Sequence, residues 1–365
     1  MERLLCILSS MNAGGAETFL MKVYRQLDKA KYQFDFCINE RNKCFYEDEI
    51  LSMGGKIYRI TEKSASLLKF KKQLYEVVNS NGYQYVLRVC SNAAGFMDLE
   101  IAHKAGAKVC AVRSSNSSDG RGLKLKIAHT LGQLMYSRYV NVKIAPSDLA
   151  AIYTFGEKAY KDGAVNMLHN AVDLNTYRYD AKIREHLRSE IGVSRETVLL
   201  GHVGRFMTQK NHKFLLQVFE EFLKIKEDSR LMLIGGGPLE EEIRSRVKEL
   251  GLDGKVIFMG IRSDVPGLLS AMDALVFPSL YEGMPNTVIE AQATGLPCVI
   301  ADTITREANI TGLVQYLPLG NAKQWADYLA KLPPVTRATP VQSFIDNCYD
   351  IESVTSRFVK LVFQR

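Results

Sequence analysis

The sequence predicts an α/β fold built of two doubly wound domains, each with its own parallel sheet. Short apolar or β-branched runs recur along all 365 residues, and longer segments with helical periodicity separate them. Strands and helices that alternate in this way form βαβ units with buried parallel strands. A chain of this length is also suited to two ordinary domains rather than one.

The apolar runs fall into two series of six. The first series is Leu4–Leu8, Gln33–Ile38, Lys56–Ile60, Tyr85–Val89, Lys108–Val112 and Val142–Ala145. The second is Val198–Val203, Arg230–Ile234, Lys255–Met259, Ala274–Phe277, Pro297–Ile300 and Leu313–Tyr316. The clearest helix candidates are Ala16–Leu27, Leu67–Asn79, Asn211–Lys226, Leu239–Leu250 and Thr287–Thr294, of which the first and fourth follow glycine-rich turns.

The boundary between the series falls near residues 166–195. Asn166–Asn175 indicates a strand followed by a turn, and Tyr177–Gly192 indicates a charged surface helix. We therefore expect domains at residues 1–170 and 175–345, with a C-terminal helix at about 350–365 that can pack back on the first. The triplet Leu332-Pro333-Pro334 should end the last regular helix of the second domain. Two open sheets of this kind bind ligands at the carboxyl ends of their strands, and we expect a cleft there.

The composition excludes several classes of protein. With 47% apolar and 24% charged residues, the chain is neither disordered nor collagen-like. No apolar run approaches the roughly 18 residues of a membrane span. The five apolar residues Leu4 to Leu8 are too short for a secretory segment, so we expect the chain to stay in the cytoplasm. Seven cysteines without a Cys-x-x-Cys pair and six histidines without His-Glu-x-x-His predict no structural metal.

Two carboxylates lie eight residues apart in Tyr281-Glu282-Gly283-Met284-Pro285-Asn286-Thr287-Val288-Ile289-Glu290. The glycine and proline favour a turn, after which Asn286 or Thr287 can cap a helix. The free N–H groups at that helix start would suit a phosphate or a sugar hydroxyl. Glu282 would then lie on the loop, and Glu290 about one turn into the helix could accept hydrogen bonds from a vicinal diol such as a ribose. The alternative is an ordinary capped surface helix whose glutamates have no role in binding.

Two cations follow another buried strand, in Gly201-His202-Val203-Gly204-Arg205-Phe206-Met207-Thr208-Gln209-Lys210. Arg205 and Lys210 at a strand's carboxyl end could clamp a diphosphate, although a basic loop alone is usually a solvated one. Gly14-Gly15-Ala16-Glu17 follows the first strand and opens a helix, so a phosphate could approach its backbone. Gly235-Gly236-Gly237-Pro238 is better explained as a tight strand-to-helix turn.

In this order the motifs resemble a GT-B-fold retaining glycosyltransferase of the family 4 type, from the bacterial exopolysaccharide and capsule group. The similarity covers nearly the whole chain, and Asn170-Ala171-Val172-Asp173 at the junction and Phe277-Pro278-Ser279-Leu280 extend it. The resemblance implies that Arg205 and Lys210 neutralise the donor diphosphate and that Glu290 holds the ribose. It further implies that Glu282 binds a donor-sugar hydroxyl, that Ile261 lies near the base, and that Gly15 faces the diphosphate.

The same resemblance implies donor contacts from the backbone that follows Gly204 and from Gly283, Met284, Pro285, Asn286 and Thr287. It requires no cofactor, and the chain contains no Asp-x-Asp triplet that would suggest a metal. One departure is the loop after Lys108–Val112, where similar enzymes often carry histidine and this chain has Arg113-Ser114-Ser115-Asn116-Ser117-Ser118-Asp119. Arg113, Asn116 and Asp119 are therefore acceptor-side candidates.

The function that we expect is transfer of a hexose or hexosamine from a nucleoside-diphosphate sugar, UDP-linked, to a polyprenyl-diphosphate-linked saccharide. A GT-B-fold sugar-nucleotide epimerase and a non-catalytic sugar-nucleotide binder stay open as alternatives. A dinucleotide-dependent oxidoreductase is disfavoured because the chain has no Gly-x-Gly-x-x-Gly motif.

The net charge of +7 lies entirely in residues 1–175, which carry 24 Lys and Arg against 17 Asp and Glu. No platform of interleaved aromatic residues accompanies it, so we expect no nucleic-acid partner. Cations beside apolar residues instead suggest an anionic membrane surface on the inner face of the plasma membrane, an ordinary solvated helix face being the alternative. These cations are Lys69, Lys71 and Lys72 within Ser66–Val78, and Arg121, Lys124 and Lys126 beside Leu123, Leu125 and Ile127.

Overall fold

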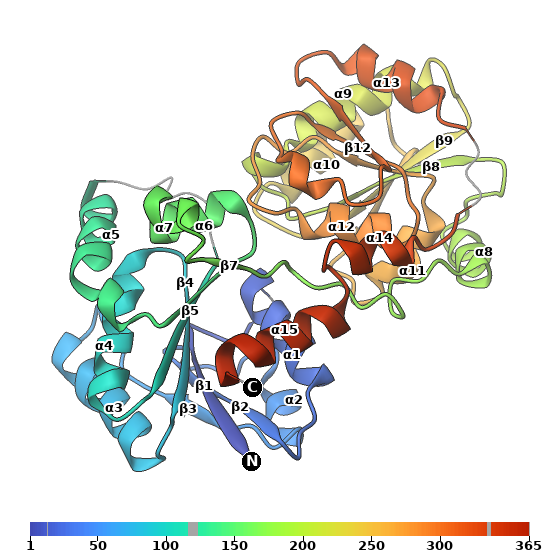
Figure 1. The fold of residues 1–365 in the computed structure, drawn as a ribbon. Helices are drawn as coiled ribbons and strands as arrows, with labels where there is room; N and C mark the ends of the chain where they lie inside the picture. The colour runs from blue at the N-terminus through green and yellow to red at the C-terminus, as the bar shows by residue number, and fades with distance from the viewer. Residues whose placement is uncertain (13, 116–122, 334–336, 365) are drawn as a thin grey trace. The chain divides into compact units, whose positions relative to one another are not determined.

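A computed structural model describes residues 1–12, 14–115, 123–333 and 337–364 of the chain. These residues form two compact units (Figure 1). Unit 1 consists of Met1–Ala171 together with Cys348–Arg365, and unit 2 consists of Val172–Asn347. The chain thus leaves unit 1 once and returns to it at its C-terminal end.

Unit 1 is built on a parallel sheet, in which the described residues give seven strands in the order β3-β2-β1-β4-β5-β6-β7. The strands are β1 (Glu2–Ile7), β2 (Tyr32–Ile38), β3 (Ile57–Arg59), β4 (Tyr85–Cys90), β5 (Val109–Ser114), β6 (Val142–Ala145) and β7 (Asn166–Met167). The helices are α1 (Gly15–Gln26), α2 (Glu47–Ser52), α3 (Leu67–Ser80), η1 (Ala93–Phe96), α4 (Met97–Lys104), α5 (Leu123–Tyr136), η2 (Ser137–Tyr139), α6 (Asp148–Phe155), α7 (Glu157–Lys161) and α15 (Ile351–Phe363).

Unit 2 repeats the design with six strands among its described residues, in the order β10-β9-β8-β11-β12-β13, again all parallel. The strands are β8 (Val198–Val203), β9 (Ser229–Ile234), β10 (Val256–Gly260), β11 (Ala274–Phe277), β12 (Cys298–Ala301) and β13 (Val314–Leu317). The helices are α8 (Ala181–Glu190), η3 (Thr208–Lys210), α9 (His212–Leu223), α10 (Glu240–Glu249), α11 (Val265–Ala271), α12 (Asn286–Ala293), η4 (Arg306–Ala308), α13 (Ala322–Ala330) and α14 (Val341–Asp346).

The α/β prediction is confirmed, because each of the twelve apolar runs forms a parallel strand within two residues of its expected bounds. Every residue of β5 and of β11 is buried, as expected for strands that helices cover on both faces. Six of the seven cysteines are likewise buried as free thiols. Apolar burial on both faces therefore explains both the continuous runs and the parallel topology.

The helices differ from the expected ones in three places. Helix α8 begins at Ala181 rather than at Tyr177, because the Asp180 carboxylate accepts hydrogen bonds from the N–H groups of residues 182 and 183 at 2.8 and 3.0 Å. The prolines near residue 333 do not end the helical part of unit 2, because α14 follows them. The short helices α2, α6 and α7 were not expected, since five to eight residues give too little periodicity to detect.

Helix α15 belongs to unit 1 and packs on α1 through aromatic rings. The Phe358 ring lies 6.3 Å from that of Phe19 and 5.7 Å from that of Phe34, measured between centroids. Phe358 and Val362 are fully buried. The C-terminal segment is therefore part of the hydrophobic core of unit 1.

In each sheet, the strand order reverses between two neighbouring strands. These are β1 and β4 in unit 1 and β8 and β11 in unit 2, where Leu200 pairs with Ala274. Ligands of open parallel sheets bind beyond the carboxyl ends of the strands at this point, because the flanking loops diverge there. No helix formed by the described residues is long and apolar enough to cross a membrane.

Candidate functional site

An ion pair joins the two loops that follow β8 and β11 in unit 2. The Lys210 ammonium lies 2.6 Å from a carboxylate oxygen of Glu282, and the two side chains are only 16% and 11% exposed. The same ammonium lies 4.6 Å from the centroid of the Phe277 ring, at the end of β11. The site therefore brings together two of the three residues predicted to act on the donor, 72 positions apart in the chain.

Backbone hydrogen bonds hold the two loops in register. The N–H of Leu280 donates to the carbonyl of Gln209 at 2.8 Å. The Gln209 amide returns a hydrogen bond to the carbonyl of Tyr281, also at 2.8 Å. Gln209 was not a predicted site residue, yet it fixes the spacing between the cationic loop and the glutamate loop.

Arg205 lies on the same loop and is exposed, and its guanidinium makes no ion pair with any described residue. Its loop packs against the glycine-rich turn after β9. At Gly235, where φ is +137°, a Cβ atom would lie 2.2 Å from the Gly204 carbonyl oxygen. A Cβ atom at Gly237 would lie 2.6 Å from the Phe206 carbonyl oxygen. The Gly235–Gly237 turn is thus the strand-to-helix connection expected, and its lack of side chains lets the Arg205 loop approach.

Helix α12 begins at Asn286, but its cap differs from the expectation. Pro285 occupies the N-cap position and no side chain caps the helix, so neither Asn286 nor Thr287 does so. Proline has no side-chain acceptor, so the N-cap residue supplies no side-chain oxygen to the first turn of the helix. Glu290 is the fifth residue of α12, as the spacing predicts, and is half-buried.

Two buried histidines that the sequence analysis did not select lie beneath Lys210. The imidazole of His202, on β8, donates a hydrogen bond through Nδ1 to the carbonyl of Val276 at 2.9 Å, and its ring lies 4.8 Å from that of His212. His212 stacks on Phe206 with centroids 4.4 Å apart. Burial, together with the nearby Lys210 charge, lowers the pKa of His212 to about 4, and burial also lowers the pKa of His202 well below its ordinary value.

These neutral rings form an uncharged, close-packed base for the cationic loop. A charged base would repel the Lys210 ammonium, so histidines with lowered pKa values are compatible with a cation packed above them. The signal in the sequence was a histidine inside a run of buried strand residues, which must be neutral to remain there.

The expected base-binding segment follows β10. Gly260 has φ +65°, and Ile261 beyond it is 87% exposed. The Arg262 guanidinium pairs with Asp264 at 2.6 Å, so its charge is already compensated. An exposed apolar side chain on a strand-end loop offers a surface on which a flat ring can pack.

The remaining candidates lie in unit 1 or outside the described residues. Gly15 is the first residue of α1, after Gly14 at the N-cap position. Arg113 is 1% exposed, lies 3.6 Å above the Phe19 ring, and donates to Asn170 at 2.6 Å. As placed here, Arg113 offers no surface to an acceptor. It holds the segment at the unit boundary instead. Asn116 and Asp119 lie outside the described residues.

The arrangement in unit 2 can bind a diphosphate. It presents one unpaired guanidinium, one ammonium shared with a carboxylate, and an uncapped helix start on neighbouring strands of one sheet. Among the described residues, no group of three or more His, Cys, Asp or Glu could hold a metal ion.

The family model for glycosyl transferases group 1 matches residues 197–333. EpsF of Bacillus subtilis strain 168, named a glycosyltransferase, is 33% identical over 352 residues, which cover 94% of this chain and 90% of EpsF. An Escherichia coli enzyme named UDP-Gal:alpha-D-GlcNAc-diphosphoundecaprenol alpha-1,3-galactosyltransferase is 29% identical over 141 residues, or 38% of this chain and 36% of that enzyme.

Solved structures share the fold over the full length. Anabaena HepE in complex with UDP superposes with a TM-score of 0.78 at 16% identity, covering all of both chains. A glycosyltransferase from Rickettsia africae gives a TM-score of 0.79 at 14% identity, covering all of this chain and 98% of that one. The GT-B architecture predicted from the motifs is thereby confirmed. With its match to EpsF over nearly its whole length, the chain belongs to the group 1 glycosyl transferases and is a GT-B-fold glycosyltransferase.

Proposed function

We propose that this glycosyltransferase moves a hexose or hexosamine from a UDP-linked donor to a polyprenyl-diphosphate-linked saccharide, with retention at the anomeric carbon. The observation that carries the donor half is the pairing of Lys210 with Glu282 beside the unpaired Arg205. Two cations on one strand-end loop can stabilise the negative charge that develops on a departing nucleoside diphosphate.

The names of relatives support the choice of donor and acceptor. The Escherichia coli relative is named for UDP-galactose as donor and for a sugar on diphosphoundecaprenol as acceptor. A Campylobacter jejuni relative, 29% identical over 136 residues, is also named for a diphospho-undecaprenol acceptor. Both matches lie over less than two fifths of this chain, so the acceptor rests on analogy with these names.

In the proposed step, the bond between the anomeric carbon and the diphosphate oxygen breaks while the acceptor oxygen bonds to the same face of that carbon. The acceptor hydroxyl gives its proton to the departing diphosphate, so no protein base is needed. Arg205, Lys210 and the first N–H groups of α12 stabilise the charge on the leaving group. Glu282 accepts a hydrogen bond from a donor-sugar hydroxyl, and Glu290 from the ribose. The step requires no metal ion.

The test is nucleotide release from a panel of sugar nucleotides, with lipid-linked saccharide present and with EDTA added. Wild type is compared with Arg205→Ala, Glu282→Ala and a control, Lys213→Ala, which removes a lysine of α9 that is 67% exposed and paired with Glu242. We expect Arg205→Ala to lower the rate about 100-fold, as loss of one group that stabilises a leaving charge does. The control should retain the wild-type rate.

Several results would reject parts of this proposal. Wild-type rates in both Arg205→Ala and Glu282→Ala would show that the site is elsewhere. Release of free epimerised sugar without acceptor would indicate an epimerase. A lack of turnover with every acceptor tested would indicate a binding protein. Inverted anomeric configuration in the product, read from its proton coupling, would exclude retention. Loss of activity in EDTA that Mg²⁺ restores would exclude metal independence.

We further propose that unit 1 meets an anionic membrane surface through α3 and α5. Both helices expose large apolar side chains, with Leu68 83% and Leu134 78% exposed. Exposed apolar residues beside cations suit the boundary between lipid headgroups and acyl chains. The cations in the described residues are Lys69, Lys71 and Lys72 on α3 and Lys124 and Lys126 on α5, whereas Arg121 lies outside them.

Co-sedimentation with anionic vesicles tests this surface. Reversal of Lys69, Lys71, Lys72 and Lys124 to Glu should reduce the bound fraction at least tenfold, since each cation near such a surface contributes about 1 kcal/mol. The control reverses four exposed lysines of unit 2, namely Lys213, Lys226, Lys248 and Lys323, with the same change in net charge. If both variants sediment alike, binding follows net charge alone and the proposed surface is wrong.

A further inference from the structure

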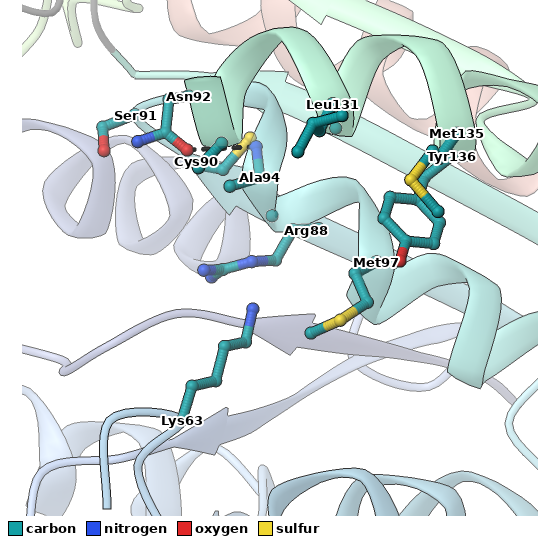
Figure 2. A pocket seen from close by; sticks show the side chains of 13 residues that line it. Lys63, Arg88, Cys90, Ser91, Asn92, Ala94, Met97, Leu131, Met135 and Tyr136 are labelled. Carbon is teal, nitrogen blue, oxygen red and sulfur yellow. Dashed lines mark hydrogen bonds between the residues drawn. The ribbon is translucent and has the colours of Figure 1, made fainter. Parts of the chain in front are cut away.

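A cavity of about 460 Å³ opens in unit 1 beyond the carboxyl end of β4 (Figure 2). Its lining comes from the end of β4 and the segment after it, together with Lys63 and helix α5, and the carboxyl ends of strands are where open parallel sheets bind ligands. Its floor and walls are chemically distinct. The residues that define them are Lys63, Arg88, Met97, Leu131, Met135 and Tyr136.

The floor is cationic. The Lys63 ammonium lies 2.5 Å from one oxygen of Asp98, and Nε of Arg88 lies 2.8 Å from the other. Figure 2 shows the two cationic groups facing one another. Because Asp98 is buried and supplies a single negative charge, one positive charge is left over at the floor.

Part of this charge is available to a ligand. Nη1 of Arg88 donates to the carbonyls of Ile7 and Val89, both at 2.9 Å, whereas its Nη2 makes no hydrogen bond with any described residue. The Lys63 ammonium has three donors and its one anionic partner is Asp98. Burial lowers the pKa of Lys63, and the nearby charge of Arg88 lowers it further, whereas Asp98 opposes the shift.

The outer wall is apolar and extends to the surface. Leu131 and Met135 on α5 line the cavity and are 48% and 52% exposed. Close packing fixes this helix, since a Cβ atom at Gly132 would lie 2.2 Å from the carbonyl oxygen of Ala93 in η1. The ring of His129 also accepts a hydrogen bond from the Ala93 N–H at 3.1 Å. The wall is therefore in place before any ligand binds.

We propose that this cavity binds the diphosphate of the lipid-linked acceptor, with the first units of its lipid chain along Leu131 and Met135. An uncompensated positive charge at the floor selects an anion, and an apolar wall that runs outward selects an anion attached to an apolar chain. A sugar alone would leave the charge unpaired, and inorganic diphosphate would leave the wall in water. The identity of the ligand rests on the proposed function, whereas its amphipathic, anionic character rests on the cavity.

Direct binding tests the inference without any transfer reaction. Farnesyl diphosphate serves as a short lipid diphosphate, inorganic diphosphate as the headgroup alone, and farnesol as the chain alone, each titrated calorimetrically into the full chain with excess UDP. We expect farnesyl diphosphate to bind best. Lys63→Gln should weaken it about tenfold, the usual effect of losing one charge-assisted hydrogen bond. Leu131→Ser should weaken farnesyl diphosphate and leave inorganic diphosphate unchanged.

The control is Lys108→Gln, which makes the same charge change at an exposed lysine just before β5, at the amino ends of the strands and away from the cavity at their carboxyl ends. Equal affinities in wild type, Lys63→Gln and Lys108→Gln would overturn the proposal. Equal binding of inorganic and farnesyl diphosphate, with no effect of Leu131→Ser, would overturn its lipid part. A competition assay with labelled farnesyl diphosphate distinguishes a membrane headgroup from the acceptor. If phospholipid vesicles displace the label as effectively as unlabelled farnesyl diphosphate does, the cavity binds a membrane headgroup instead. Failure of the donor chemistry would appear separately, as an Arg205→Ala variant that keeps its wild-type rate.

Discussion

Glu282→Gln is expected to tighten the binding of UDP, even though Glu282 belongs to the proposed donor site. Without ligand, its carboxylate holds the Lys210 ammonium at 2.6 Å. A diphosphate that binds Lys210 must share this cation with the carboxylate or displace it. Glutamine keeps the shape of the side chain and removes its negative charge, so the cation becomes available without competition.

The size of the effect follows from the burial of the pair. Exposed ion pairs contribute about 0.2–1 kcal/mol, and pairs withdrawn from water contribute more because solvent screens them less. With side chains 16% and 11% exposed, the pair lies toward the buried end of this range. We therefore expect Glu282→Gln to improve UDP affinity by about 1.4 kcal/mol, which is tenfold. Lys210→Gln should weaken UDP by about tenfold or more, because it also leaves the carboxylate beside the diphosphate.

Calorimetric titration of UDP into the wild type, the two single variants and the double variant measures these changes and their coupling. Lys213→Gln is the matched control, because it breaks a comparable pair, 2.5 Å to Glu242, at 67% and 48% exposure. It should change UDP affinity less than twofold. If Glu282→Gln weakens UDP as strongly as Lys210→Gln does, the carboxylate supports nucleotide binding and the competition argument is wrong. A UDP-sugar should gain less than UDP, since it loses its hydroxyl contact with Glu282.

Three further outcomes test the packing around the sites. Burial lowers the pKa of His212 to about 4 from an ordinary 6.5. The contribution of neutral His212 to the free energy of unfolding is therefore fully present above pH 6.5 and is lost as the pH drops toward 4. Between pH 7 and 4.5, the free energy of unfolding should therefore fall by about 2.5 kcal/mol less in His212→Phe than in the wild type, as measured by urea unfolding. Gly235→Ala, with φ +137° and a Cβ atom 2.2 Å from the Gly204 carbonyl oxygen, should destabilise by about 2 kcal/mol or more in thermal unfolding and weaken UDP. Asp35→Asn removes the buried carboxylate paired with Arg3 at 2.5 Å and should destabilise by about 3 kcal/mol, whereas an unchanged melting temperature would contradict that.

The strands could be predicted closely, whereas several helix ends could not. A parallel strand is apolar on both faces, and its run of residues therefore stands out without knowledge of its neighbours. Helix ends depend on single hydrogen bonds, such as those that Asp180 accepts and Pro285 lacks. The sequence shows which residues can cap, but tertiary packing decides which of them does so.

The same distinction applies to the site. Arg205, Lys210 and Glu282 follow from the rule that ligands bind beyond the carboxyl ends of strands, which needs only strand positions. The contact between Lys210 and Glu282 needs the order of strands as well, because β8 and β11 are neighbours in space and not in sequence. His202 stands inside an apolar run, which marks it as buried, but its contacts with Val276 and His212 depend on the tertiary structure.

The positive charge of unit 1 illustrates why a count of cations is an incomplete guide. Arg113 is buried on Phe19, and Arg88 is held by Asp98, whereas Lys69 and Lys72 are exposed. Exposed cations act at a distance and are screened within about 10 Å at 0.1 M salt, so any attraction to a membrane must weaken as salt rises. Cations at the floor of a cavity act by contact and are screened far less. The excess positive charge of residues 1–175 therefore includes exposed cations, which can attract a surface, and cations in a cavity, which can hold a ligand. The effect of the first group should weaken with added salt much more than that of the second.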